Sequence, residues 1–526
     1  ENVTNKRGDE KGMGIGKLNC KYVPNSLEQW SFNLLTKQIN DFDNTSLISI
    51  TDIDETSLKS KKDTKNTYAS GNLEWHKKIS TKHAFSTSSY FEYDKRNLNL
   101  FWDTNRSLSD LIPLTPTEIN SLKLLRQVKK KNFSSVFKHY WTINNFNLLH
   151  TTFGNQYRQH HFFTNDSQLL ANETVNDFAV NGFGNDLNFK LNDLYLGVYY
   201  NIRAGKFEFQ HSLFLHNYSW SINQTNSIKK NKWVLLPDFT LRTGSSSSKG
   251  LLRLDSGLKS SFSDVSKLAS NYYLQSYNSV HIGNENLENE LLHSSSITYS
   301  RSNLFRGLFL LSIFNYSYKI DGVINSIRTR NQERIFSATM LHKPNQSLSG
   351  VLVIRKKIKK IKYNLTTRFL SAKSSELINS TISKYKSTNG SYKISVQSSH
   401  KGFPIVEVGY KQSIGSYSSN NSKNKFITNE PFFKFDYDFF KRFIFSFDYT
   451  HYKYQNKSNQ LTNTYNVSNT SLSYGKENSA WNFKISGQNL FDVQFKNQNS
   501  FNVYVNSETK TFVLPRVVLF SIIYKM

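Results

Sequence analysis

Alternation of apolar and polar side chains constrains this chain more than any other feature of its sequence. In the stretch PFFKFDYDFF, the odd positions 433–439 carry Phe or Tyr, while the even positions 434–438 carry Lys or Asp. After a short turn at 440–442, aromatic residues again occupy every second position over 443–449. A period of two indicates a β-strand with two unlike faces. Two such strands joined by a tight turn predict a β-hairpin.

The same pattern of two alternating strands joined by a tight turn recurs along the chain. Residues 193–220 predict a second hairpin, and long connections rich in Asn, Ser, Thr and Lys, such as 54–67 and 413–429, separate the hairpins. A helical period is weak everywhere, and only 115–130 suggests a short helix within a connection. We therefore expect an all-β, antiparallel fold in which short turns alternate with long loops.

Composition favours a large membrane-spanning sheet. The 526 residues are only 37% hydrophobic, yet 14% are aromatic, with 40 Phe and 29 Tyr. No window approaches the roughly 18 apolar residues of a transmembrane helix, so a membrane would be crossed by strands. Apolar faces rich in Phe and Tyr are typical of a transmembrane β-barrel, which has short periplasmic turns and long extracellular loops. A soluble β-sandwich or propeller also alternates, and that alternative stays open.

The chain ends on RVVLFSIIYKM, its most apolar strand-like stretch. Because a closed barrel has no edge, we expect this last strand to pair with the first strand. The stretch resembles the C-terminal assembly signal of bacterial outer-membrane proteins, which implies the barrel assembly machinery as a partner. The residues of this signal alternate on one face of the strand: Phe520, Ile522, Tyr524 and Met526. Met526 stands where the signal usually has Phe.

Two further stretches resemble motifs of TonB-dependent receptors, and the resemblance extends over about residues 15–526. One motif closes a strand near the C-terminus and continues just before the last strand. Its residues here are Asn489, Leu490, Phe491, Asp492, Leu514, Pro515 and Arg516. The other lies in HIGNENLENE, where the matching residues are Gly283, Asn284, Asn286, Leu287 and Glu290. In that stretch Glu285, Glu288 and Asn289 replace the Pro, Lys and Pro of the family's element.

The resemblance implies a single domain over residues 1–526: a 22-stranded barrel in the bacterial outer membrane, without the N-terminal plug domain of the family. Either the plug belongs to a longer chain, or another polypeptide supplies it, or the barrel is an open pore. The barrel would import a scarce, bulky solute such as a metal chelate, a vitamin or an oligomer. The implied partners are outer-membrane lipid and lipopolysaccharide, the TonB complex acting through a plug, and a surface lipoprotein or other envelope proteins.

The chain is strongly basic, with 67 Lys and Arg against 39 Asp and Glu. Basic runs such as RKKIKKIK at 355–362 lack any accompanying nucleic-acid-binding motif, so we interpret them as solvated turns and expect no nucleic-acid partner. The sequence contains no nucleophile elbow, and the pair His160 and His161 has no further metal ligands near it in the sequence. We therefore expect no enzyme activity and no cofactor. Two alternatives stay open: an outer-membrane barrel that scaffolds an envelope complex, and a soluble basic all-β binding module.

Overall fold

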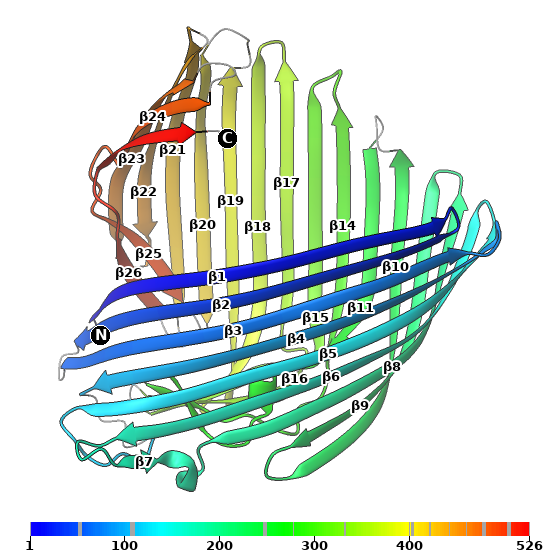
Figure 1. The fold of residues 1–526 in the computed structure, drawn as a ribbon. Helices are drawn as coiled ribbons and strands as arrows, with labels where there is room; N and C mark the ends of the chain where they lie inside the picture. The colour runs from blue at the N-terminus through cyan, green and yellow to red at the C-terminus, as the bar shows by residue number, and fades with distance from the viewer. Residues whose placement is uncertain are drawn as a thin grey trace.

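The chain folds almost entirely into β-strands, as the computed structural model shows (Figure 1). The structure describes residues 2–524 except 51–54, 106–110, 246–249, 277, 331–332, 399, 401–403, 420–421, 441, 459, 476–479 and 502–505. Within the described residues, 25 strands belong to one sheet and two more form a separate hairpin. The predicted all-β, antiparallel fold is confirmed.

Of the 25 strands, 21 follow one another as a continuous antiparallel wall. The other four pair near one end of the sheet: β7 (Val175–Asp177), β12 (Tyr273–Ser276), β13 (Ser279–His281) and β16 (Glu333–His342). The first ten wall strands are β1 (Asn2–Asn25), β2 (Glu28–Ile50), β3 (Glu55–Lys78), β4 (His83–Thr104), β5 (Asn120–Asn144), β6 (Asn147–Leu169), β8 (Asn185–Ala204), β9 (Phe207–Asn223), β10 (Ser227–Ser245) and β11 (Gly250–Ser261). The others are β14 (Glu290–Asn303), β15 (Leu308–Arg330), β17 (Gln346–Ile358), β18 (Ile361–Ile378), β19 (Thr381–Ser398), β20 (Ile405–Ser419), β21 (Lys423–Phe439), β22 (Phe443–Asn456), β23 (Leu461–Gly475), β24 (Trp481–Gln488) and β27 (Val517–Tyr524).

The two ends of the wall carry different connections. At one end, which we call the turn side, strands join through tight turns such as 26–27, 205–206 and 359–360. The opposite end, the loop side, carries the long connections. These contain β7 (Val175–Asp177), η1 (Phe178–Asn181), η2 (Val265–Leu268), β12 (Tyr273–Ser276), β13 (Ser279–His281), β16 (Glu333–His342), and the hairpin of β25 (Phe495–Phe501) and β26 (Asn506–Phe512).

Strands extend further toward the loop side than the sequence predicted. The segment 54–67, expected as a polar loop, lies mostly in β3, and the expected loop 413–429 lies mostly in β20 and β21. The expected helix at 115–130 is also wrong, because β5 begins at Asn120. A strand of 24 residues spans roughly 80 Å, well beyond the ~30 Å of bilayer hydrocarbon. Backbone pairing can therefore continue where both faces meet water, and there the alternation that marks a strand is lost.

The two faces of the wall are chemically distinct, as β19 illustrates. Its odd positions 383–397 carry Ser, Tyr, Asn, Lys and Gln, and Ser395 is buried. Its even positions include Ile394 and Val396, which are 50% and 42% exposed. In β8 the even residues from Leu194 to Val198 are likewise exposed, whereas odd residues toward its start are buried beneath a loop. Exposed apolar side chains on one face distinguish the outer surface of the wall, as expected of a surface that faces lipid.

The wall cannot close by direct antiparallel pairing of its first and last strands. Among the described residues, β1 pairs only with β2, and β27 pairs only with β24. Because 20 antiparallel steps separate β1 from β27, these two strands run in the same direction. The expected pairing of the last strand with the first is absent among the described residues. Among the described residues the wall has 21 strands, one fewer than the 22 that the resemblance implies.

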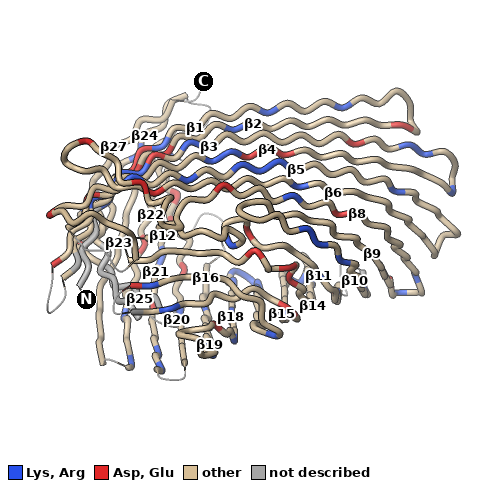
Figure 2. Tube along the Cα trace, turned by 90° about the horizontal axis from the view of Figure 1, so that it is seen from below, with Lys and Arg blue, Asp and Glu red and all other residues tan. Residues whose placement is uncertain are grey.

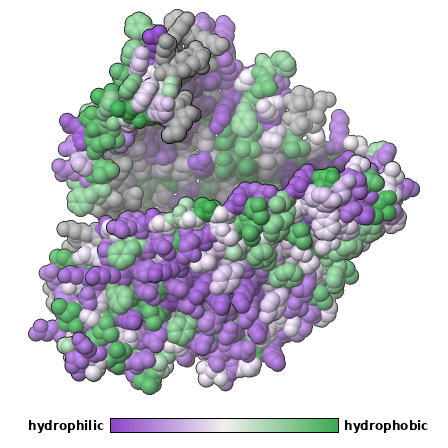
Figure 3. All heavy atoms as spheres, viewed as in Figure 1, coloured by the Kyte–Doolittle hydropathy of each residue, from purple (hydrophilic) through white to green (hydrophobic). Residues whose placement is uncertain are grey.

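The wall curves around a hollow, which is open in the view of Figure 3 between the strands near the N-terminus and those near the C-terminus. Lys and Arg are spread along many strands rather than gathered in one block (Figure 2). The basic run 355–362 contains the tight turn at 359–360, where the sequence predicted a solvated turn. None of the described helices has the length and apolar character required to span a membrane.

Candidate functional site: the loop-side rim

Three connections fold inward at the loop side and cover part of the inner face of the wall. We call the described residues of 111–119, 170–184 and 262–289 the rim cap. From it, Val265, Leu268 and Leu287 pack against the inner-face residues Leu191 and Trp220 of β8 and β9. A neighbouring cluster joins rim-cap side chains to β5. Its buried members include Ile112, Leu122, Leu124, Phe178, Phe183, Leu274 and Val280. Burial of each large apolar side chain contributes about 1.5–3 kcal/mol, so these clusters hold the cap on the wall.

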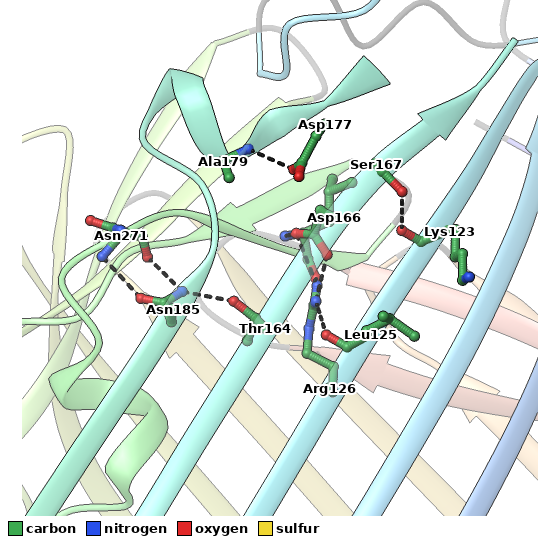
Figure 4. Close-up of polar contacts among 11 residues, drawn as sticks. Lys123, Leu125, Arg126, Thr164, Asp166, Ser167, Asp177, Ala179, Asn185 and Asn271 are labelled. Atoms are coloured by element: carbon green, nitrogen blue, oxygen red, sulfur yellow. Dashed lines mark hydrogen bonds and ion pairs between the residues drawn. The ribbon is translucent and has the colours of Figure 1, made fainter. Parts of the chain in front are cut away.

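A buried ion pair fixes β12 to the wall (Figure 4). Arg126 of β5 and Asp166 of β6 form two parallel hydrogen bonds, and the Asp166 side chain is fully buried. The backbone N–H of Leu274 donates to Asp166 (2.8 Å), and the Leu274 carbonyl accepts from Arg126 (2.6 Å). The pair therefore satisfies its own charges and both backbone groups of one rim-cap residue. Removing either partner would leave a buried charge unpaired, which typically costs about 3–5 kcal/mol.

An amide network holds the neighbouring part of the cap, again at the loop-side ends of the strands (Figure 4). The buried Asn185 side chain donates to Thr164 (2.9 Å) and to the carbonyl of Asn271 (3.2 Å), and it accepts from the Asn271 N–H (3.1 Å). Asn271 in turn donates to the carbonyl of Gly184 (2.7 Å). Nearby, Asp177 caps η1 by accepting from the Ala179 N–H (3.0 Å). The buried side-chain amide of Asn185 is thus paired at both its nitrogen and its oxygen, as burial of a polar group requires.

The motif residues of HIGNENLENE form the return of the rim cap to the wall. The N–H groups of Gly283 and Asn284 donate to the carbonyls of Ala269 and Lys267 (2.6 and 2.7 Å). A Cβ at Gly283 would lie 2.5 Å from the Lys267 carbonyl oxygen, so only glycine allows this backbone approach. The Asn284 side chain donates to Ala338 O (3.1 Å) and accepts from the Asn286 N–H (2.9 Å).

The last two residues of that motif anchor its C-terminal end. Leu287 is buried in the larger apolar cluster. Glu290, the first residue of β14, accepts from the Lys319 ammonium (2.6 Å) and from the Val323 N–H (2.7 Å). The replacement residue Glu288 adds a contact of its own, to Lys232 (2.9 Å). Hydrogen bonding from Lys232 lowers the pKa of Glu288 below its usual value, which keeps this carboxylate ionised.

The two halves of the C-terminal motif meet at the base of the last loop. The Asn489 amide donates to the carbonyls of Val493 (3.0 Å) and Leu514 (2.9 Å), and Asp492 accepts from the Arg516 N–H (2.9 Å). Asn489 and Asp492 both have positive φ, 51° and 54°, which Asn and Asp tolerate better than most residues. These side chains therefore clamp the two ends of the loop together.

The other residues of the C-terminal motif lie at the same place. The Leu490 N–H donates to the Ser468 carbonyl (2.9 Å), and the Phe491 ring contacts Tyr449 edge-on at 6.0 Å. Leu514 is largely exposed, and Pro515 lies between it and Arg516 just before β27. No described hydrogen bond joins this motif to the mid-chain motif. The structure places the two motifs at separate loop bases.

The residues of the predicted assembly signal lie on the outer strand β27. Phe520, Ile522 and Tyr524 are all more than half exposed, and they pair in register with Ile485, Phe483 and Trp481 of β24. Met526 lies outside the described residues. An exposed apolar stripe at the last strand is what the signal requires, and its recognition by the assembly machinery stays a prediction.

The pair His160 and His161 does not form one site. Its members lie on opposite faces of β6, where His160 contacts Asn132 (3.1 Å) and His161 contacts Asp186 (2.6 Å). Among the described residues, no three His, Cys, Asp or Glu side chains lie close enough to hold a metal ion. The sequence did not single out Arg126, Asp166 or Asn185, because their partners lie 21 to 148 residues away and leave no local pattern.

Known proteins resemble this chain in structure and not in sequence. No family model matches the sequence, and no curated protein matches it. The copper transporter OprC superposes with a TM-score of 0.53, with 11% identity, over 99% of this chain and 80% of that chain. The siderophore receptor PiuA from Acinetobacter baumannii gives 0.47, with 8% identity, over 99% and 79% of the two chains. The ferric-catecholate import receptor Fiu from K12 E. coli gives 0.45, with 10% identity, over 99% and 81%.

These solved structures are described as a transporter and as receptors for metal-binding compounds. The superposition on OprC establishes that this chain has the same β-barrel fold. The sequence-based resemblance is therefore confirmed at the level of the fold.

We predict that Gly283→Ala loosens the rim cap, because its Cβ would overlap the backbone of residues 267–269. The expected loss is about 1–3 kcal/mol of local stability, measured as faster amide hydrogen exchange over 262–289. Gly12→Ala is the control, since a Cβ at Gly12 meets nothing within 4 Å. Unchanged exchange in the Gly283 variant would contradict the assigned role.

We also predict that acid loosens the rim cap through His281. Burial, with Lys267 nearby, lowers the pKa of His281 to about 4, and its Nδ1 has no hydrogen-bond partner among the described residues. As the pH falls below about 6.5, His281 becomes protonated in the unfolded cap but stays neutral in the folded cap, so the free energy of unfolding the cap falls. Between pH 7 and pH 5 the loss should reach about 2 kcal/mol, measured by hydrogen exchange. His281→Phe should remove this pH dependence, and its persistence would show that another group titrates.

Proposed function

We propose that this chain is the barrel of a TonB-dependent receptor that imports a scarce, bulky solute across the bacterial outer membrane. The observation that carries the proposal is the fold: a 21-strand wall that superposes on a copper transporter over 99% of its length. The two motifs shared with the receptor family support it, because their residues close loop bases at the loop side. The solute class is a metal chelate, a vitamin or an oligomer.

In this proposal the loop side faces the cell exterior, and the rim cap narrows the entrance on the inner face. Solutes would be captured by the long connections and would then pass along the polar inner face of the wall. Barrels of this size enclose a lumen that needs a plug to be gated. Residues 1–526 are proposed as one barrel domain without a plug. TonB would act on a plug that lies elsewhere, and a surface lipoprotein is a further proposed partner.

The rim cap has a defined part in this mechanism. The ion pair of Arg126 and Asp166 holds β12 to the wall without leaving a free charge at the entrance. The entrance is therefore shaped by a segment that is separate from the wall and that can be perturbed without breaking the strand ladder. Cargo that contacts the cap would experience a fixed surface at neutral pH.

Uptake in the bacterium that encodes the protein tests the proposal. We expect deletion of the gene to lower accumulation of one probe among radiolabelled copper, ferric siderophores and vitamin B12 by roughly tenfold, a loss typical of removing the specific route. Re-expression of the full-length protein should restore uptake, and loss of TonB or an uncoupler should abolish it.

Uptake that persists in the presence of the uncoupler would contradict energised import and favour an open pore. Unchanged uptake of every probe, together with loss of other envelope proteins from the outer membrane, would favour the scaffold alternative. The two results are distinguishable in one set of strains.

A further inference from the structure

We propose that a basic groove on the outer surface of the wall, at the loop side, binds the phosphorylated headgroup of an outer-leaflet lipid. The groove has a volume of about 720 Å³ and lies across β15, β17, β18, β19 and β20. Its lining includes Lys343, Lys373, Lys384 and Lys386, with Tyr316. The inference rests on the proposed membrane location, and it assigns to the barrel a specific lipid site.

Strand register places the lysines on the outer face. Lys373 of β18 is paired with Lys386 of β19, and paired residues of neighbouring strands point to the same side. Lys384 and Lys386 share the even positions of β19 with Ile394 and Val396, the exposed apolar residues nearer the turn side. By register, Lys373, Lys384 and Lys386 therefore lie on the outer surface of the wall at its loop-side end, and Lys343, in the connection before β17, lines the same groove.

The apolar surface begins directly below the groove. Phe369 lies four residues from Lys373 along β18, about 13 Å along the strand, and it points to the same face. Phe314 of β15 contacts Phe369 at 6.0 Å, and both rings are exposed. Between these rings and the lysines lies Tyr316, which is 39% exposed. Tyrosine at this level is typical of a membrane interface. The acyl chains of a bound lipid would contact these aromatic rings, and its headgroup would contact the lysines.

The charge of the groove is unbalanced. None of the described residues that line it is Asp or Glu. The four lysine side chains are exposed, and none makes an ion pair with a described acidic residue. Like charges on adjacent strands repel each other, so an anion that bridges Lys373, Lys384 and Lys386 would relieve the repulsion. Serine hydroxyls at Ser375 and Ser418 line the same groove and can donate to phosphate oxygens.

The occupant that fits these features is a glycolipid of the lipid A class, with phosphate groups on a sugar headgroup and several acyl chains. Phosphates would contact the lysines, and the chains would lie on the rings below. A free anion would use the lysines but not the apolar surface. A plain phospholipid would offer one phosphate to four cations.

Native mass spectrometry of the full-length protein in detergent tests the site, with bisphosphorylated lipid A and its dephosphorylated form as probes. The variant K343Q/K373Q/K384Q/K386Q should retain at least roughly tenfold less bisphosphorylated lipid A than the wild type, because it removes all four cationic partners of the anionic headgroup. The fourfold Lys→Arg variant keeps the charge and should retain the lipid, which separates loss of charge from loss of folding.

A matched control removes the same charge from the turn side. The variant K357Q/K359Q/K360Q/K362Q changes four lysines around the tight turn between β17 and β18, at the far end of the same strands. It should bind lipid A as the wild type does. Equal loss in both fourfold variants would show a nonspecific effect of net charge and would overturn the site.

Other results also overturn the inference. Unchanged retention in the loop-side variant, or equal retention of dephosphorylated lipid A by the wild type, would show that the lysines do not select the lipid. Displacement of the lipid by millimolar inorganic phosphate would identify a free anion as the ligand. Failure of the wild-type protein to insert into bilayers would refute the membrane location itself. Insertion without lipid A retention would refute only the lipid site.

Discussion

The pairing of backbone hydrogen-bonding groups is the constraint on which this structure depends. An unpaired N–H or C=O in hydrocarbon costs several kcal/mol, so a chain that crosses a bilayer with strands must give each strand two neighbours. The wall strands from β2 to β24 meet this condition through antiparallel ladders on both sides. Because each strand then needs only one apolar face, a chain with 37% hydrophobic residues has enough apolar surface to form the wall.

The same constraint explains why the conventional core is small and lies at one end. The wall is held by ladders along its whole length, whereas the rim cap is held by two apolar clusters, a buried ion pair and side-chain amides. The cap is therefore a separate energetic unit, which can open while the wall stays intact. In the proposed receptor, such a cap would respond to pH or cargo at the entrance while the strand ladders of the wall stay paired.

Much of the fold could be predicted from the sequence, because a period of two reports the two faces directly. The hairpin at 433–449 and the turn within RKKIKKIK are where the pattern predicted them. The loop-side extensions could not be predicted, since polar side chains on both faces of β3 resemble a loop in sequence. The motif residues Gly283 and Asn489 could be identified by resemblance, but their close backbone contacts could not. The ion pair of Arg126 and Asp166 could not be predicted from the sequence. Its partner Leu274 is distant in the sequence and comes close only when the cap folds onto the wall.

The central claim is that this wall spans a membrane with its even-numbered β19 residues facing lipid. Spin-label accessibility along residues 391–397 tests it most directly, in full-length protein reconstituted into bilayers with Cys20 replaced by Ser. We expect labels at positions 392, 394 and 396 to be reached by lipid-soluble oxygen, and labels at 391, 393 and 397 by a water-soluble nickel chelate. A period of two with this phase would support the account. Uniform access to the nickel chelate, or the opposite phase, would contradict it.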